Sequence, residues 1–111
     1  MKKEQETVLE EIYKLIHARK RTAESHKRLE RNIDYLVKDG VVVRELPKDG
    51  EYILYDILAH AASLRPGGYL KHKPDAVKCM DIVYEKYNKN VYLSEIHIEN
   101  GKIVSEKSCY N

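Results

Sequence analysis

The chain lacks phenylalanine and tryptophan altogether, and it contains only two cysteines among its 111 residues. These two, Cys79 and Cys109, are too far apart for a CxxC metal or redox motif, and a single pair gives no disulfide framework. We therefore expect a reducing, cytoplasmic environment. Tyrosine occurs nine times. Every large aromatic side chain thus carries a hydroxyl that needs water or a protein partner.

A long apolar run is also missing. No segment approaches the roughly 18 apolar residues of a membrane span, and residues 1–11 are too acidic for a signal peptide. With 42% apolar and 34% charged residues, the composition is that of a soluble globular protein and excludes a disordered one. A length of 111 residues suits one modest core, so we predict a single domain over residues 1–111 and no membrane partner.

Positive charge is concentrated in one stretch of the chain. Residues 17–32 hold six lysine or arginine residues and only two glutamates, a net charge of +4, whereas the whole chain carries +2. Clustered cations attract polyanions such as nucleic acid, which makes this stretch the main functional signal. The structural alternative is a solvated charged face beside a helix junction.

Helical periodicity begins near Thr7 and changes near Thr22. The apolar residues of a first helix share one face: Val8, Leu9, Ile12, Leu15 and Ile16. Thr22 is typical of a new N-cap, so we predict a break there and a second helix from residue 25 or 26 to residue 38. The alternative is one long helix, because heptad spacing runs from Ile12 to Leu36 with three polar residues in its seam.

A β-hairpin is predicted after the second helix, which ends at Gly40. Residues 41–46 are rich in β-branched side chains, and residues 51–55 form the returning strand. Pro47 and Gly50 supply the turn between them.

The second half of the chain repeats this order of helices followed by strands. Asp56 is a suitable cap for a short helix over residues 57–64, and a longer helix opens at Pro74 and ends at residues 88–90.

A second hairpin is predicted at the C-terminal end. Residues 91–98 and 102–107 flank the dipeptide Asn100-Gly101, a strong hairpin signal that places Glu99 opposite Lys102.

Residues 25–55 resemble the end of a winged-helix DNA-binding domain. The resemblance rests on a basic helix anchored by Leu29, Ile33 and Leu36, a glycine turn at Gly40, and the hairpin that follows. Residues 18–24 are too short for the extra helix that a full winged helix places before its recognition helix. The resemblance implies that the basic helix enters the major groove and that the hairpin touches the DNA backbone.

The predicted fold class is therefore α+β. It comprises a winged-helix-like part over residues 5–55 (helix, helix, β-hairpin) and an extension over residues 56–111 of two helices and a second hairpin. The expected function is that of a small regulatory protein that binds duplex DNA as a homodimer. The candidate nucleic-acid contacts are Arg19, Lys20, Arg21, Lys27, Arg28, Arg31, Arg44 and Lys48.

Other interpretations stay open. A second basic region consists of Arg65, Lys71, His72, Lys73 and Lys78. Sequence alone leaves undecided whether it joins the first. The alternative function is a protein-interaction or inhibitor module of a virus or mobile element, whose basic surface docks on a partner protein. No pattern marks an activated nucleophile or a metal-ligand cluster, so we predict neither an enzyme nor a cofactor.

Overall fold

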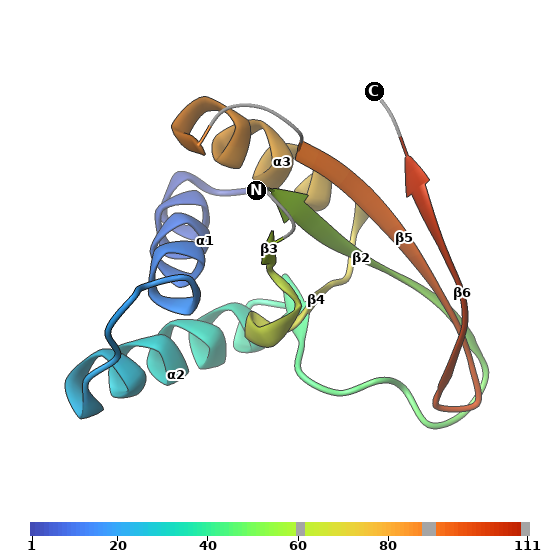
Figure 1. Cartoon of the computed structure of the whole chain (residues 1–111). Helices are drawn as coiled ribbons and strands as arrows, with labels where there is room; N and C mark the ends of the chain where they lie inside the picture. Colours follow the sequence, from blue (N-terminus) through green and yellow to red (C-terminus); the bar gives the residue numbers. More distant parts are fainter. Residues whose placement is uncertain (60–61, 88–90, 110–111) are drawn as a thin grey trace.

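A computed structural model describes residues 1–59, 62–87 and 91–109 of the chain. These residues form three α-helices and one antiparallel sheet, which confirms the α+β class, and Figure 1 shows the helices beside the sheet. The helices are α1 (Lys3–Ile16), α2 (Ala23–Lys38) and α3 (Lys73–Tyr87), with a 3₁₀ turn, η1 (Arg65–Gly67). The strands are β1 (Val42–Val43), β2 (Glu51–Ala59), β3 (Ala62–Ser63), β4 (Tyr69–Leu70), β5 (Val91–Glu99) and β6 (Lys102–Cys109). Their order in the sheet is β1-β4-β2-β5-β6, and β3 pairs with β2.

The break between the first two helices is confirmed, and the single long helix is wrong. Thr22 caps α2: its side chain accepts a hydrogen bond from the Ser25 amide at 3.0 Å, and the Ser25 hydroxyl accepts one from the Thr22 amide at 2.9 Å. This reciprocal pair satisfies two N–H groups at the helix start. It fixes the direction in which α2 leaves α1.

The C-terminal hairpin is also confirmed. Asn100 and Gly101 have φ values of 49° and 85°, as a two-residue type I′ turn requires, and Glu99 lies opposite Lys102. A β-bulge interrupts the pairing near His97. The helix predicted from Pro74 is present as α3, although its predicted end at residues 88–90 lies outside the described residues.

The predicted wing is wrong. β1 pairs with β4 and not with β2, whereas β2 pairs along its full length with β5. The segment between β1 and β2 is a connection, and its Gly50 contacts the β5–β6 turn. The Asn100 amide donates to the Gly50 carbonyl at 2.9 Å, and the Gly50 amide donates to Asn100 Oδ1 at 3.0 Å. The turn residues at 47–50 therefore guide the chain to a distant turn.

The short helix predicted over residues 57–64 is wrong as far as the structure describes that segment. β2 runs on to Ala59, across the boundary at residues 55 and 56 at which the sequence interpretation divided the domain. Asp56 is buried in the middle of this strand and caps no helix. A local pattern cannot distinguish the two outcomes because β2 is stabilised by strands on both of its sides.

The core lies on both sides of the sheet. Ile57 and Leu93 point to the side covered by the helices, and with residues of α1, α2 and α3 they form the larger cluster. Leu54 and Ile96 belong to a smaller cluster on the opposite side. Side chains alternate along a strand, so positions an odd number apart face opposite sides. Both sides of the central strand pair thus contribute to the core.

Replacement of Thr22 by alanine should lower the free energy of unfolding by about 1 kcal/mol, because the Ser25 amide loses its acceptor. Urea denaturation measures the change. Thr22→Ser is the matched control and should stay close to wild type, since serine is an equally good N-cap. An equal loss in both variants would contradict this account of the helix break.

Candidate nucleic-acid interface

A row of exposed cations follows α2. Lys27, Arg31 and Lys38 lie within about 40° of the direction opposite to the buried apolar residues of the helix, since successive residues turn by roughly 100°. Arg19 and Lys20 are exposed in the connection just before the helix. These five residues are called the basic ridge below. None of them forms an ion pair within the described part of the chain.

Three of the predicted contacts are engaged inside the molecule. Arg28 forms an ion pair with Glu11 of α1, and the Arg21 guanidinium donates to the carbonyl of Ile16. Arg44 lies 2.8 Å from a Glu30 carboxylate oxygen and 2.7 Å from one of Asp34, and the hydrogen bond to Asp34 raises the pKa of Arg44. Arg28 and Arg44 join α2 to neighbouring segments and Arg21 binds the end of α1, which reduces the availability of all three for a partner.

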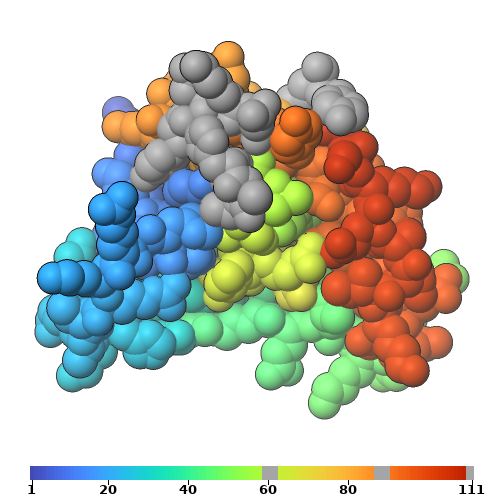
Figure 2. Space-filling view, in the orientation of Figure 1, coloured from blue at the N-terminus to red at the C-terminus, as the bar shows by residue number. Residues whose placement is uncertain are grey.

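Lys48 is separated from the other candidates. Its Cα would lie 3.6 Å from a Cβ added at Gly101, so it sits beside the β5–β6 turn. That turn is at the opposite end of the molecule from the α1–α2 connection (Figure 1). Figure 2 shows the same separation, with the blue α1–α2 corner on one side and the red β6 strand on the other.

Lys38 is a ridge residue that the sequence interpretation missed. It lies seven residues after Arg31, a spacing of about two helical turns, so helical periodicity could have identified it. The second basic region begins beside this end of α2, because the Lys71 amide donates to the Val41 carbonyl at 3.0 Å. Lys71 is thus placed near the C-terminal end of α2, whereas Arg65 and Lys78 of the same region pair with Glu106 and with Glu6 of α1.

A buried polar network lies on the side of the sheet away from the helices. The Asp56 side chain is only 1% exposed and accepts hydrogen bonds from the Ser63 hydroxyl and the Ile57 amide. Arg65 reaches from η1 to within 3.6 Å of Asp56 and also pairs with Glu106 of β6. Burial raises the pKa of Asp56, and the Ser63 hydrogen bond and the Arg65 charge oppose this shift. The network lines a cavity of about 490 Å³ and anchors η1 to the sheet.

A second polar group lies on the helix side of the sheet, beyond α3. Glu95 accepts from the Cys109 thiol at 3.1 Å and lies 3.2 Å from His97 Nε2. The Cys109 hydrogen bond lowers the pKa of Glu95, and the same bond raises the pKa of Cys109. A thiol with a raised pKa is a poor nucleophile.

Metal binding and thiol chemistry find no further support in the described residues. Burial raises the pKa of the Cys79 thiol to about 12, so this cysteine is an inert core residue. Within the described ranges, no group of three or more histidine, cysteine, aspartate or glutamate side chains has an arrangement that holds a metal ion.

Comparison of the chain with protein-family models, with curated proteins and with solved structures finds no match. In the part of the chain that the structure describes, no helix has both the length and the apolar character needed to cross a membrane.

Replacement of Arg65 by alanine should lower the free energy of unfolding by about 1–3 kcal/mol at pH 7, because the buried Asp56 carboxylate loses its cation. The pKa of Asp56, already raised, rises further in the variant. The loss should therefore be complete above that pKa and shrink as the pH falls through it. Urea denaturation from pH 7 down to about pH 4 tests both points.

The matched control is Arg44→Ala, which removes an exposed arginine with two carboxylate partners. Its cost should be less than about 1 kcal/mol, because water screens exposed ion pairs. Equal losses for the two variants, or a loss at Arg65 that does not change with pH, would contradict the anchoring role of the network.

Proposed function

We propose that the protein binds the phosphate backbone of duplex DNA through the basic ridge. The observation that carries the proposal is that its five exposed cations have no ion-pair partner among the described residues and follow one rigid, capped helix. Lys27 and Lys38 are about 16 Å apart along the helix axis, so the ridge spans several phosphates. Binding releases condensed counterions from DNA, which supplies the driving force.

The ridge favours contact with the backbone over reading of base edges. Arg31 is the one ridge residue on α2 that offers the bidentate fork suited to guanine. Glu24 and Asp34 are exposed on the same side of α2, and their charges oppose deep entry of this helix into a groove. Sequence preference should therefore be weak. We also propose that two chains bind one duplex together, since a homodimer doubles a modest number of phosphate contacts.

A second candidate function is docking to a partner protein. Exposed large apolar side chains on the sheet favour it, because such side chains mark interaction sites where they lie together. Ile53 and Val104 are exposed on the helix side of the sheet, and Tyr52 and Ile103 are exposed on the other side. They belong to β2 and β6, away from the ridge. The two functions therefore use different surfaces and can be tested separately.

The double variant Lys27→Ala, Arg31→Ala should weaken binding to a random labelled duplex by about tenfold at low salt. Four or five phosphate contacts predict a slope of log K against log salt of about −4, and loss of two should reduce it by about 2. Fluorescence anisotropy at several salt concentrations measures both quantities, and sedimentation equilibrium of the same samples gives the number of chains per duplex.

The matched control is Lys48→Ala, Lys102→Ala, which removes the same charge at the opposite end of the molecule. It should leave affinity and slope nearly unchanged. Equal weakening by both double variants would show that net charge alone drives binding, and would rule out the ridge. Absence of binding by the wild type at low salt would rule out the DNA function itself.

A further inference from the structure

β6 forms an open edge of the sheet. It is eight residues long and, among the described residues, pairs with β5 alone. Residues 102–108 are all exposed, and Figure 1 shows the strand at the outer margin of the molecule. Such an edge presents a row of unpaired N–H and C=O groups that can accept another strand.

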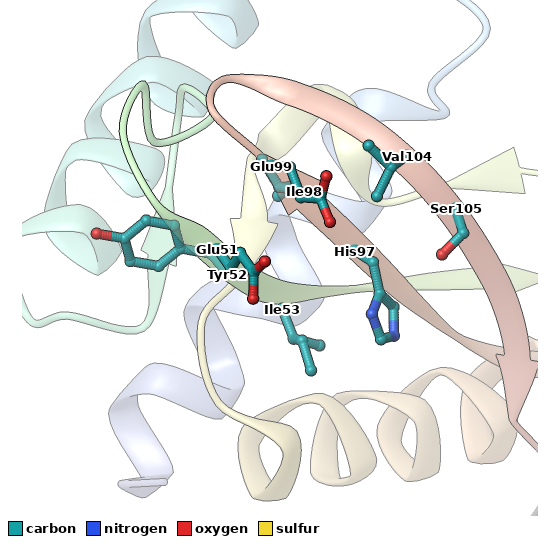
Figure 3. A pocket seen from close by; sticks show the side chains of 8 residues that line it. All are labelled: Glu51, Tyr52, Ile53, His97, Ile98, Glu99, Val104 and Ser105. Carbon is teal, nitrogen blue, oxygen red and sulfur yellow. The ribbon is translucent and has the colours of Figure 1, made fainter.

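Exposed apolar side chains lie on this strand and further into the sheet. Val104 and Ile103 of β6 are 53% and 38% exposed, and Ile53 of β2, which β5 separates from β6, is 44% exposed. A shallow depression of about 650 Å³ is lined in part by Ile53, His97, Val104 and Ser105, whose side chains surround it in Figure 3. The edge therefore has an apolar surface next to its free backbone groups.

The bulge decides which side chains share a side of the sheet. Ser105 lies opposite His97 and Ile103 lies opposite Ile98, so Val104 is the additional residue. Lys102, Ser105 and Lys107 pair with alternate residues of β5 and therefore point to the helix side. Val104 and Ser105 together lie opposite His97 in the bulge, and Figure 3 shows both side chains at the border of the depression. On the helix side, β6 therefore presents, in order, the side chains of Lys102, Val104, Ser105 and Lys107.

This pattern disfavours a second copy of the chain as the partner strand. Two β6 strands related by a two-fold axis would pair antiparallel, with side chains on the same side facing each other. A centre at Glu106 or Lys107 places each of these charges opposite its own copy. A centre at the bulge places Lys102 opposite Lys107. Like charges directly opposite each other are destabilising, so each of these three registers carries a repulsion.

We infer that β6 accepts an extended segment of a different protein as an added antiparallel strand. The segment carries acidic residues opposite Lys102 and Lys107 and an apolar residue opposite Val104. Glu106 points to the other side of the sheet, where it pairs with Arg65, so Lys102 and Lys107 set the charge that the segment needs on the helix side. Main-chain hydrogen bonds supply affinity, and the alternating side chains supply specificity.

The inference is tested with the synthetic peptide Ac-TETVVET-NH2 and its charge-reversed match Ac-TKTVVKT-NH2, titrated into the labelled full-length protein and followed by amide chemical shifts. The acidic peptide should shift the amides of residues 102–108 and bind about fivefold or more tightly than the basic one, because two cross-strand pairs change from attractive to repulsive. Equal binding of the two peptides, or shifts confined to other elements, would overturn the inference.

Two controls separate strand addition from general charge attraction. Two further versions of the acidic peptide carry N-methyl groups, one on the odd-numbered and one on the even-numbered residues. The version whose methylated amides face β6 should lose binding. Unchanged binding of both methylated peptides would overturn the inference. The variant Lys102→Gln, Lys107→Gln should lose the preference for the acidic peptide, whereas Lys38→Gln, Lys71→Gln, with the same change in charge, should keep it.

The titration contains no nucleic acid, so its result is independent of the proposed DNA binding. The variant Lys27→Ala, Arg31→Ala should bind the acidic peptide as the wild type does, which keeps the two proposals distinguishable. Sedimentation equilibrium adds one further outcome. A dimer of the isolated protein that the Lys102→Gln, Lys107→Gln variant alters would make a second copy the partner at β6 and overturn the inference.

Discussion

The pairing of β2 with β5 is the interaction on which the rest of the structure depends. It joins residues 51–59 to residues 91–99 over nine consecutive positions, and it makes β2 central, with β5 on one side and β3 and β4 on the other. Ile57 and Leu93 lie opposite each other in this pair and form the surface on which the helices pack. Because β5 occupies one side of β2 and β3 and β4 occupy the other, β1 pairs with β4 and not with β2. The same pairing makes β6 the outer strand.

Those parts of the fold that depend on neighbouring residues could be predicted from the sequence. Thr22 and Ser25 are three residues apart and cap α2 by themselves, and Asn100 and Gly101 form the turn of the β5–β6 hairpin alone. The partner of β2 could not be predicted, because its pairing with β5 closes a loop of about 40 residues. The entropy lost on closing this loop and the free energy gained by the pairing depend on residues far apart, so no short stretch of sequence reveals them. Asp56 illustrates the limit. An aspartate before an apolar run is typical of a helix cap, yet here Ser63 and Arg65 accommodate it within a strand.

The candidate site shows the same division. Composition located the concentration of positive charge, and helical periodicity determines which of its members point away from the core. Ion pairs between elements could not be predicted from the sequence. Arg28 pairs with Glu11, and Arg44 pairs with Glu30 and Asp34. Part of a charged stretch can thus serve to join elements of the fold while the rest remains available. Charge counted along a sequence therefore overestimates the charge that a partner meets.

The β-bulge at Val104 connects the fold to the two proposed interactions. Without the additional residue, side chains would alternate regularly along β6, and Lys102 and Glu106 would share one side of the edge. Two copies could then pair around Val104 with two lysine–glutamate contacts. The bulge moves Lys102 to the side of Lys107, which removes this register and sets lysine opposite lysine when two copies pair around the bulge. Bulges and edge lysines are common means of preventing uncontrolled strand pairing. At this edge they also select for a partner of complementary charge. A proposed DNA-binding dimer must accordingly form through a surface other than β6, which leaves the edge free while the ridge is occupied.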